Sequence, residues 1–281
     1  MEQERDLQAA LEPKDMHPAG EKHLRDQIGA SRTSASDRSV DLTATAYERI
    51  EEHFVQMTLK PGSLARTQDI QTLVGLGRTP VHQAVRRFSA ETLIEVRPRN
   101  GLKIAPVDLA RERHLATLRR DLTRFVTEAA MRNMNDNARA RLSYLRRQLA
   151  NGASDMTADR FNEIDKSFDL LLIEISRERF LERTLRPLHT LARRTGYLHF
   201  IEISGDDGVR RSIDLHLTIM DAVLADDGER ARQGCDDLVR YGIGVIDELG
   251  TRVDPQFLDI AYPSLTPHEP KTREGSLAMG A

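Results

Sequence analysis

One short stretch of the chain, residues 77–88 with the sequence GRTPVHQAVRRF, gathers side chains that can bind nucleic acid. Its arginines can donate two parallel hydrogen bonds, and its threonine, histidine and glutamine can bond to bases or phosphates. Between Arg78 and Lys103 the chain carries six basic residues and only two acidic ones, Glu91 and Glu95, although the formal net charge of the whole protein is −3. A local basic patch in a mildly acidic protein is typical of a site for a polyanion.

The order of residues in this stretch suits a helix that enters the major groove of DNA at its N-terminal end. Arg78 matches O6 and N7 of guanine, His82 faces the same side one turn later, and Gln83 can donate to and accept from adenine. Thr79 and the free N–H groups of the first turn can bind phosphate. The predicted DNA contacts, with the last three in the segment RPRNG, are Gln68, Arg78, Thr79, Pro80, His82, Gln83, Arg86, Arg87, Arg97, Arg99 and Gly101. The alternative is a solvated cationic helix, and the surrounding elements decide between the two.

Hydrophobic periodicity and turn residues predict those elements. The predicted order is helices over 42–57, 66–75 and 78–92, then strands over 93–97 and 102–107. In the third helix Pro80 is tolerated in the first turn. Its predicted buried stripe is Val81, Ala84, Val85 and Phe88. Three helices followed by a β-hairpin predict a winged helix-turn-helix domain over 41–106.

The rest of the ordered chain reads as helical. Predicted helices cover 108–134, 136–151, 157–177, 178–203, 208–225 and 228–249, with Pro187 expected to kink or break the fourth. Short loops between them, including one at 204–208, predict an antiparallel bundle over 107–252. The fold class is therefore mostly α, a winged helix-turn-helix followed by an all-α bundle. Polar or proline-rich composition predicts a disordered arm over 1–40 and a disordered tail over 253–281.

Composition excludes several classes of protein. No apolar run is long enough for a transmembrane helix, and the N-terminus lacks the apolar core of a signal peptide. The single cysteine, Cys235, cannot form an internal disulfide, so the expected setting is the reducing cytoplasm with no membrane partner.

Taken together, these motifs resemble the GntR family of bacterial transcription regulators, in the subgroup with a fatty-acid-regulator-type C-terminal (FCD) domain. The resemblance covers roughly residues 42–250 and is strongest at Pro61-Gly62, at 77–81 (GRTPV) and at Gly101. Family members commonly have Ser or Thr where this chain has Gly77, and Arg-Glu where it has His82-Gln83. The resemblance implies double-stranded DNA with a pseudo-palindromic operator as one partner, a homodimer, and a small organic acid bound in the helical domain.

The resemblance also implies a ligand set in the bundle. Many relatives hold a metal with one Asp and three His, and the corresponding residues here are Asp165, Asp169, His216 and Leu238. Asp165 and Asp169 lie on one helix face, but Leu238 cannot be a ligand. The predicted metal set of Asp165, Asp169 and His216 would hold a divalent ion only weakly, and the alternative is that the aspartates pair with arginines. No cofactor is certain. The predicted effector-binding residues are Arg119, Asp165, Asp169, Arg194 and His216.

The function that these observations favour is a DNA-binding transcription regulator, a repressor released by a carboxylate metabolite. Two alternatives stay open at this point, a metal-dependent enzyme and a DNA-binding protein without ligand control. The sequence contains no nucleophile elbow, P-loop or dinucleotide-binding motif, so we expect no enzymatic activity.

Overall fold

The structure is a computed structural model that describes residues 41–261 of the 281. The predicted arm over 1–40 and residues 262–281 of the predicted tail lie outside the described residues. Within the described part no helix is long and apolar enough to cross a membrane.

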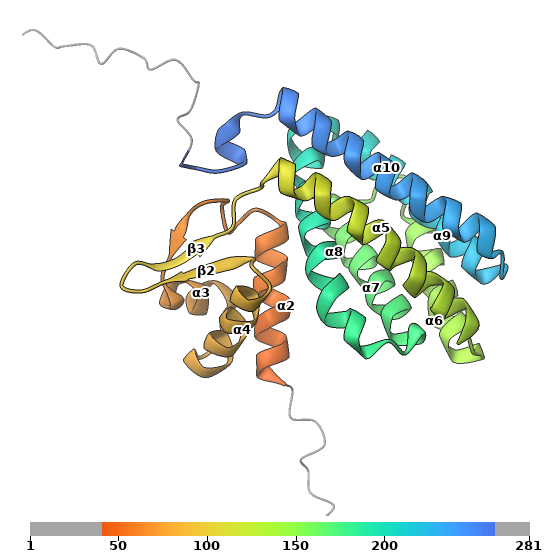
Figure 1. The fold of residues 1–281 in the computed structure, drawn as a ribbon, viewed down its shortest axis with the longest axis horizontal. Helices are drawn as coiled ribbons and strands as arrows, with labels where there is room; N and C mark the ends of the chain where they lie inside the picture. The colour runs from red at the N-terminus through yellow and green to blue at the C-terminus, as the bar shows by residue number, and fades with distance from the viewer. Residues whose placement is uncertain (1–40, 262–281) are drawn as a thin grey trace, which may run out of the picture. The chain divides into compact units, whose positions relative to one another are not determined.

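The N-terminal elements form a winged helix-turn-helix, as predicted (Figure 1). The helices are α2 (Leu42–Val55), α3 (Thr67–Val74) and α4 (Arg78–Ala90), and the strands are β1 (Leu64–Ala65), β2 (Ile94–Arg97) and β3 (Gly101–Ile104). The sheet is antiparallel in the order β1-β3-β2. The sequence did not reveal β1, because two residues are too few to show an alternating pattern.

The tip of the wing depends on one glycine. Asn100 N–H donates to the Arg97 carbonyl at 3.0 Å, and Arg99 at the turn has a φ of 67°. Gly101 follows with a φ of 85°, and a Cβ there would come within 2.6 Å of the Ala65 carbonyl oxygen. Only glycine allows β3 to begin this close to β1.

The helical domain follows a short linker after β3. Its helices are α5 (Leu109–Arg132), α6 (Asp136–Asn151), α7 (Ala158–Ser176), α8 (Arg179–His199), α9 (Gly205–Leu224) and α10 (Gly228–Arg252). Asp108, Asn135, Thr157 and Asp227 cap four of these helices with side-chain acceptors. The long helices α5 and α10 lie side by side in Figure 1 and pack against each other.

Two details of the bundle differ from the sequence prediction. Pro187 lies inside α8, and the helix continues through it without a break. The predicted loop at 204–208 is absent, because α8 runs into a π-helical turn (Phe200–Ser204) and α9 begins directly at Gly205. Gly205 has a φ of 53°, a conformation that glycine adopts at little cost, and it joins the π-helical turn to α9 without a loop.

The first part of the predicted disordered tail has a defined structure instead. A short 3-10 turn (Pro255–Phe257) follows α10. The Val107 N–H donates to the Leu258 carbonyl at 2.8 Å, and the Ile260 N–H donates to the Pro61 carbonyl at 3.0 Å. The Asp259 carboxylate occupies the space in which a Cβ of Gly62 would lie. Residues 253–261 therefore attach the end of α10 to the DNA-binding domain, which local composition could not show.

Candidate functional site

The recognition helix α4 buries the predicted stripe and exposes the predicted reading face. Val81, Ala84, Val85 and Phe88 are its buried residues. Arg78, Thr79, His82, Gln83 and Arg86 are exposed, and Pro80 is half-buried. The N-cap is Gly77, which has no side chain to cap the first turn. The N–H groups at this end of α4 are therefore free of a side-chain cap.

Two predicted DNA contacts on α4 are already engaged within the domain. Arg87 Nε donates to Glu91 Oε1 at 2.8 Å, and its guanidinium lies 3.9 Å from the centre of the Tyr47 ring. Gln83 accepts a 2.6 Å hydrogen bond from the Thr43 hydroxyl. Arg87 is thus part of the packing of α4 on α2, whereas Arg86 has no such contact in the described residues.

The remaining predicted contacts lie on the wing and on α3. Arg97 pairs with Glu95 at 3.0 Å and is half-buried, while Arg99 at the wing tip is exposed. Gln68 is exposed on α3. Gly101 allows the positive φ and the close approach of the backbone at the start of β3. The exposed cations of α4 and the wing are Arg78, Arg86 and Arg99.

A cavity opens in the helical domain among α5, α7, α8, α9 and α10. Its empty volume is about 1020 Å³, a figure that includes open solvent at the mouth. Apolar side chains form much of its wall, among them Leu115, Phe161, Phe200, Leu238, Val239 and Ile246. Four of the five predicted effector-binding residues also line it: Arg119, Asp165, Asp169 and His216.

Asp165 and His216 form a buried ion pair in this cavity. His216 Nε2 lies 2.9 Å from Asp165 Oδ1, and His216 Nδ1 lies 2.7 Å from the Ser212 carbonyl. Burial alone would raise the pKa of the Asp165 carboxyl, but the charge of His216 and its hydrogen bond hold that pKa at about 2. Burial alone would lower the pKa of His216, but Asp165 raises it above its ordinary value. With an acceptor at each nitrogen, the imidazole is stable as a cation.

Asp169, one turn further along α7, has different partners. Its Oδ2 accepts a 2.9 Å hydrogen bond from Arg193 Nη1 on α8. His189 Nδ1 lies 2.8 Å from the same oxygen, without the alignment of a hydrogen bond. The two aspartates therefore face one cavity but are neutralised by different cations.

Arg119 is the cation of the cavity without a partner. No hydrogen bond or ion pair joins it to another residue in the described part of the chain, and burial lowers its pKa below the ordinary arginine value. Its guanidinium lies over Gly242 of α10, where a Cβ would come within 3.3 Å of Nη2. An unpaired guanidinium beside an apolar wall is the arrangement that a carboxylate with an apolar part would complement.

The structure corrects the prediction for Arg194, which does not line the cavity. Its Nη1 donates to the Ala105 carbonyl at 2.7 Å, and its guanidinium lies 4.0 Å from the centre of the Phe54 ring in the DNA-binding domain. Arg193 takes the cavity position instead, because consecutive residues of a helix point about 100° apart. The pair of arginines gave no local signal for which of them faces inward.

The residues present do not form the metal site that the family resemblance implies. Asp169 is occupied by Arg193 and His189, Leu238 supplies no donor atom, and only Asp165 and His216 face each other. Within residues 41–261 no group of three or more His, Cys, Asp or Glu side chains is arranged to hold a metal ion. Structural metal sites need about four ligands, so the residues present do not fit a tightly bound metal ion.

Sequence reasoning missed one imidazole and two carboxyl side chains around the cavity. His189 and Glu112 line it, and Glu51 of α2 contacts Arg193 from outside it. Burial raises the pKa of Glu112 to about 7, although Arg194 and Arg119 oppose the rise. A signal existed for Glu51, since it lies four residues after Tyr47 and three before Phe54, on the apolar face of α2.

Comparisons with known proteins agree with this architecture. A model of the gntR family of bacterial regulatory proteins matches residues 42–104, and a model of the FCD domain matches residues 114–240. The two models together describe a DNA-binding transcription regulator with a C-terminal helical domain. The chain belongs to the GntR family and carries an FCD domain.

Individual relatives are distant. The HTH-type transcriptional repressor RspR of Escherichia coli (strain K12) is 23% identical over 192 residues, which are 65% of this chain and 79% of RspR. The HTH-type transcriptional regulator YieP of the same strain is 22% identical over 225 residues, 71% of this chain and 93% of YieP. Among solved structures, E. coli McbR/YncC has a TM-score of 0.66 at 19% identity and covers 75% of this chain with its whole length. This structural match shows a shared fold.

Proposed function

We propose that this regulator is a repressor whose hold on its operator is released by a small carboxylate in the cavity of the helical domain. The observation that carries the proposal is the unpaired guanidinium of Arg119, which lines a cavity with a largely apolar wall. One end of such a ligand would bind Arg119, and an apolar part would lie against Leu238 and Val239. The name of RspR as a repressor supports the sign of regulation.

The DNA contacts follow from the exposed face of the winged helix. Arg78 and His82 on α4 would reach base edges, and Arg86 and the wing residue Arg99 would contact phosphates. Thr79, with the uncapped N–H groups of the first turn, would hold a phosphate at the helix N-terminus. Gln83 would have to give up its bond to Thr43 to read a base. Gln68 of α3 and the wing backbone at Gly101 would add contacts to the sugar-phosphate chain.

Assembly and location complete the proposal. A pseudo-palindromic operator is read by a two-fold symmetric protein, so we propose a homodimer that works in the cytoplasm. One chain has a mass of 31.8 kDa, and light scattering on the full chain should give twice that mass. A monomer at tens of micromolar protein would contradict this part of the proposal.

The test of the effector is thermal melting against a panel of monocarboxylates and dicarboxylates. A true effector at about 100 times its Kd should stabilise the protein by about 2.7 kcal/mol, or roughly 5–10 °C in melting temperature. Arg119→Gln should abolish the rise, and the matched control Arg120→Gln should keep it, because Arg120 pairs with Asp121 outside the cavity. The same ligand should release the protein from a duplex enriched from random DNA. Stabilisation without release would favour an activator, and no response to any acid would favour a ligand-independent DNA-binding protein.

A further inference from the structure

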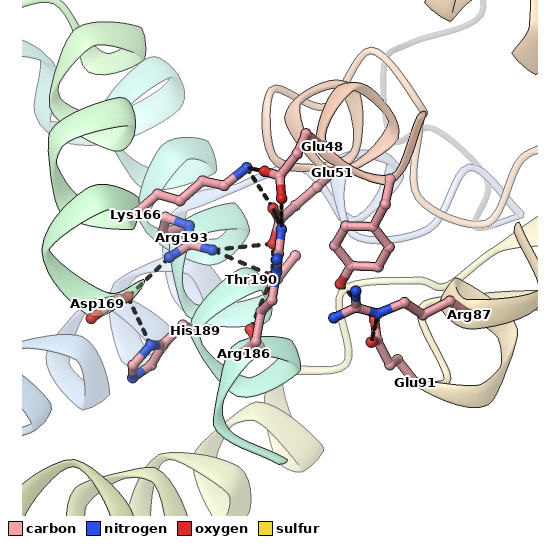
Figure 2. Close-up of polar contacts among 11 residues, drawn as sticks. Glu48, Glu51, Arg87, Glu91, Lys166, Asp169, Arg186, His189, Thr190 and Arg193 are labelled. Carbon is pink, nitrogen blue, oxygen red and sulfur yellow. Dashed lines mark hydrogen bonds and ion pairs between the residues drawn. The ribbon is translucent and has the colours of Figure 1, made fainter. Parts of the chain in front are cut away.

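A buried carboxylate joins the DNA-binding domain to the helical domain. Glu51 of α2 is only 1% exposed, and Figure 2 shows it among cations from α7 and α8. Its oxygens lie 2.7 Å from Lys166 Nζ, 2.9 Å from Arg186 Nη2 and 3.3 Å from Arg193 Nη2, and it also accepts a hydrogen bond from the Thr190 hydroxyl. Burial alone would raise the pKa of Glu51, but these cations hold it well below its ordinary value. Glu51 is therefore an anion that depends on its partners across the domain boundary.

One of those partners also belongs to the cavity. Arg193 donates through Nη1 to Asp169 at 2.9 Å and through Nη2 to Glu51 at 3.3 Å. The Arg193 side chain is 5% exposed, so water is poorly placed to replace either contact. Two carboxylates, one on the cavity wall and one on α2, share a single guanidinium, and Figure 2 shows the chain of contacts from Asp169 through Arg193 to Glu51.

We infer that Arg193 couples the charge in the cavity to the docking of α2 on the helical domain. The inference rests on the proposed function for the identity of the ligand as a carboxylate. An anion bound at Arg119 adds negative charge beside Asp169 and draws Arg193 toward the cavity. The contact with Glu51, already the longer of the two, then weakens, and α2 is held less firmly.

The consequence reaches the recognition helix, because α2 is the helix on which α4 packs. Arg194, the next residue of α8, supports the same boundary through the Ala105 carbonyl and the Phe54 ring. Leu191 of α8 is buried in the core of the DNA-binding domain. A change in the packing of α2 on α8 therefore changes the support of the whole winged helix-turn-helix domain. Thermodynamic linkage makes the effect reciprocal. If a ligand in the cavity weakens the docking of α2, then firm docking of α2 weakens the binding of that ligand.

The test needs no effector. Hydrogen exchange of the α2 amides is measured by mass spectrometry on the full chain and three variants. Asp169→Asn removes the charge that competes for Arg193, so exchange of α2 should slow by at least about threefold. Asp165→Asn removes an equal charge from the same helix, but its partner is His216 on α9, so α2 exchange should change less than about twofold. Unchanged or faster exchange in Asp169→Asn, or an equal effect in both variants, would overturn the inference.

The same boundary is probed from the other side. Glu51→Gln should speed exchange of α2 by at least about tenfold, because Lys166, Arg186 and Arg193 each lose their buried carboxylate partner on α2. Lys166 and Arg186 keep only the more exposed Glu48, and Arg193 keeps only Asp169. The matched control is Glu52→Gln, the next residue of α2, which is exposed and whose carboxylate, within residues 41–261, accepts a hydrogen bond from Gln56 alone. If the α2 amides exchange at the same rate in Glu51→Gln and Glu52→Gln, the buried network does not hold α2 and the inference is wrong. This comparison remains decisive if Asp169→Asn does not fold.

Failure of the inference and failure of the proposed function remain distinguishable. Thermal melting with the carboxylate panel reports whether the cavity binds an acid, and it does not depend on α2. If no acid binds but Asp169→Asn still slows α2 exchange, the coupling stands and the proposed effector class is wrong. If an acid binds at Arg119 but Asp169→Asn leaves the exchange rate of the α2 amides unchanged, the proposed effector class is supported and this coupling is wrong.

Discussion

The hydroxyl of Tyr47 donates a 2.6 Å hydrogen bond to Glu91 Oε2, which ties α2 to the residue that ends the recognition helix. The same carboxylate accepts from Arg87, whose guanidinium stacks on the Tyr47 ring. Tyr47 also packs against Phe88, with ring centres 4.7 Å apart and the ring planes tilted by 46°. The packing of α4 on α2 thus depends on polar and aromatic contacts among Tyr47, Arg87, Phe88 and Glu91.

The two adjacent arginines of α4 should therefore behave differently. Arg87→Ala should lower the free energy of unfolding by about 1–2 kcal/mol, since it leaves Glu91 with one partner fewer and removes the stacking on Tyr47. Arg86→Ala should change that free energy by less than about 0.5 kcal/mol and weaken DNA binding instead. Thermal melting and fluorescence anisotropy on the same samples measure both. Equal stability of the two variants would contradict the structural role of Arg87.

Base contacts and phosphate contacts should separate at Arg78 and Arg99. Arg78→Ala should cost about 1–3 kcal/mol on the selected operator and little on random DNA, because a bidentate contact to guanine reads sequence. Arg99→Ala should weaken both duplexes alike and reduce the slope of log K against log salt by about one. His82→Arg should shift the preferred base at one position of each half-site. Titrations at several salt concentrations and selection from random DNA measure these effects. Identical behaviour of Arg78→Ala and Arg99→Ala would show that the assignment of Arg78 to base contacts is wrong.

The metal content should be low. With Asp169 bound to Arg193 and Leu238 in the cavity wall, protein purified without added metal should carry well under one equivalent per chain by elemental analysis. A chelator should change neither the melting temperature nor operator binding. About one equivalent of zinc, nickel or manganese, with a melting temperature that falls on chelation, would restore a metal-dependent mechanism. Leu238→His should raise metal affinity, because it adds a donor beside Asp165 and His216.

Stability should fall with rising pH because of Glu112. Burial raises the pKa of this 8% exposed carboxyl from 4.5 to about 7, so the folded state holds the proton more tightly than the unfolded state. Its contribution is complete below about pH 4.5 and is lost as the pH rises through about 7, a difference of up to about 3 kcal/mol. Glu112→Gln should remove this part of the pH dependence. Denaturant unfolding between pH 5 and pH 8.5 gives the comparison, and parallel pH profiles of the two proteins would contradict it.

Local sequence patterns predicted most of the secondary structure and both domains. The spacing of Val81, Ala84, Val85 and Phe88 predicted the buried face of α4, and the structure confirms it. Helix ends were predicted well where a capping residue marks them, as at Asp108 and Asp227. The junction of α8 and α9 was missed, because a π-helical turn has no composition that distinguishes it from a loop.

Contacts between distant segments were beyond such patterns. Glu51 and Arg193 are 142 residues apart in the sequence, and periodicity reports only that a residue faces inward, not what it meets. The choice between Arg193 and Arg194 for the cavity depends on the rotation of α8 against its neighbours. The resemblance to known regulators pointed to Asp165, Asp169 and His216, and these residues do line one cavity, but the partners of Asp169 come from α8, where no motif marked them.

The contact between Gly62 and Asp259 links two positions that lie in different domains. Gly62 has a φ of 75°, and the Asp259 carboxylate fills the space that a Cβ at position 62 would need. A side chain at position 62 would therefore both strain the backbone and move the Asp259 carboxylate to another rotamer. Replacement of Asp259 by a smaller residue removes only the second cost, because the positive φ still favours glycine. Among homologues, glycine at 62 should therefore be most frequent where residue 259 is acidic.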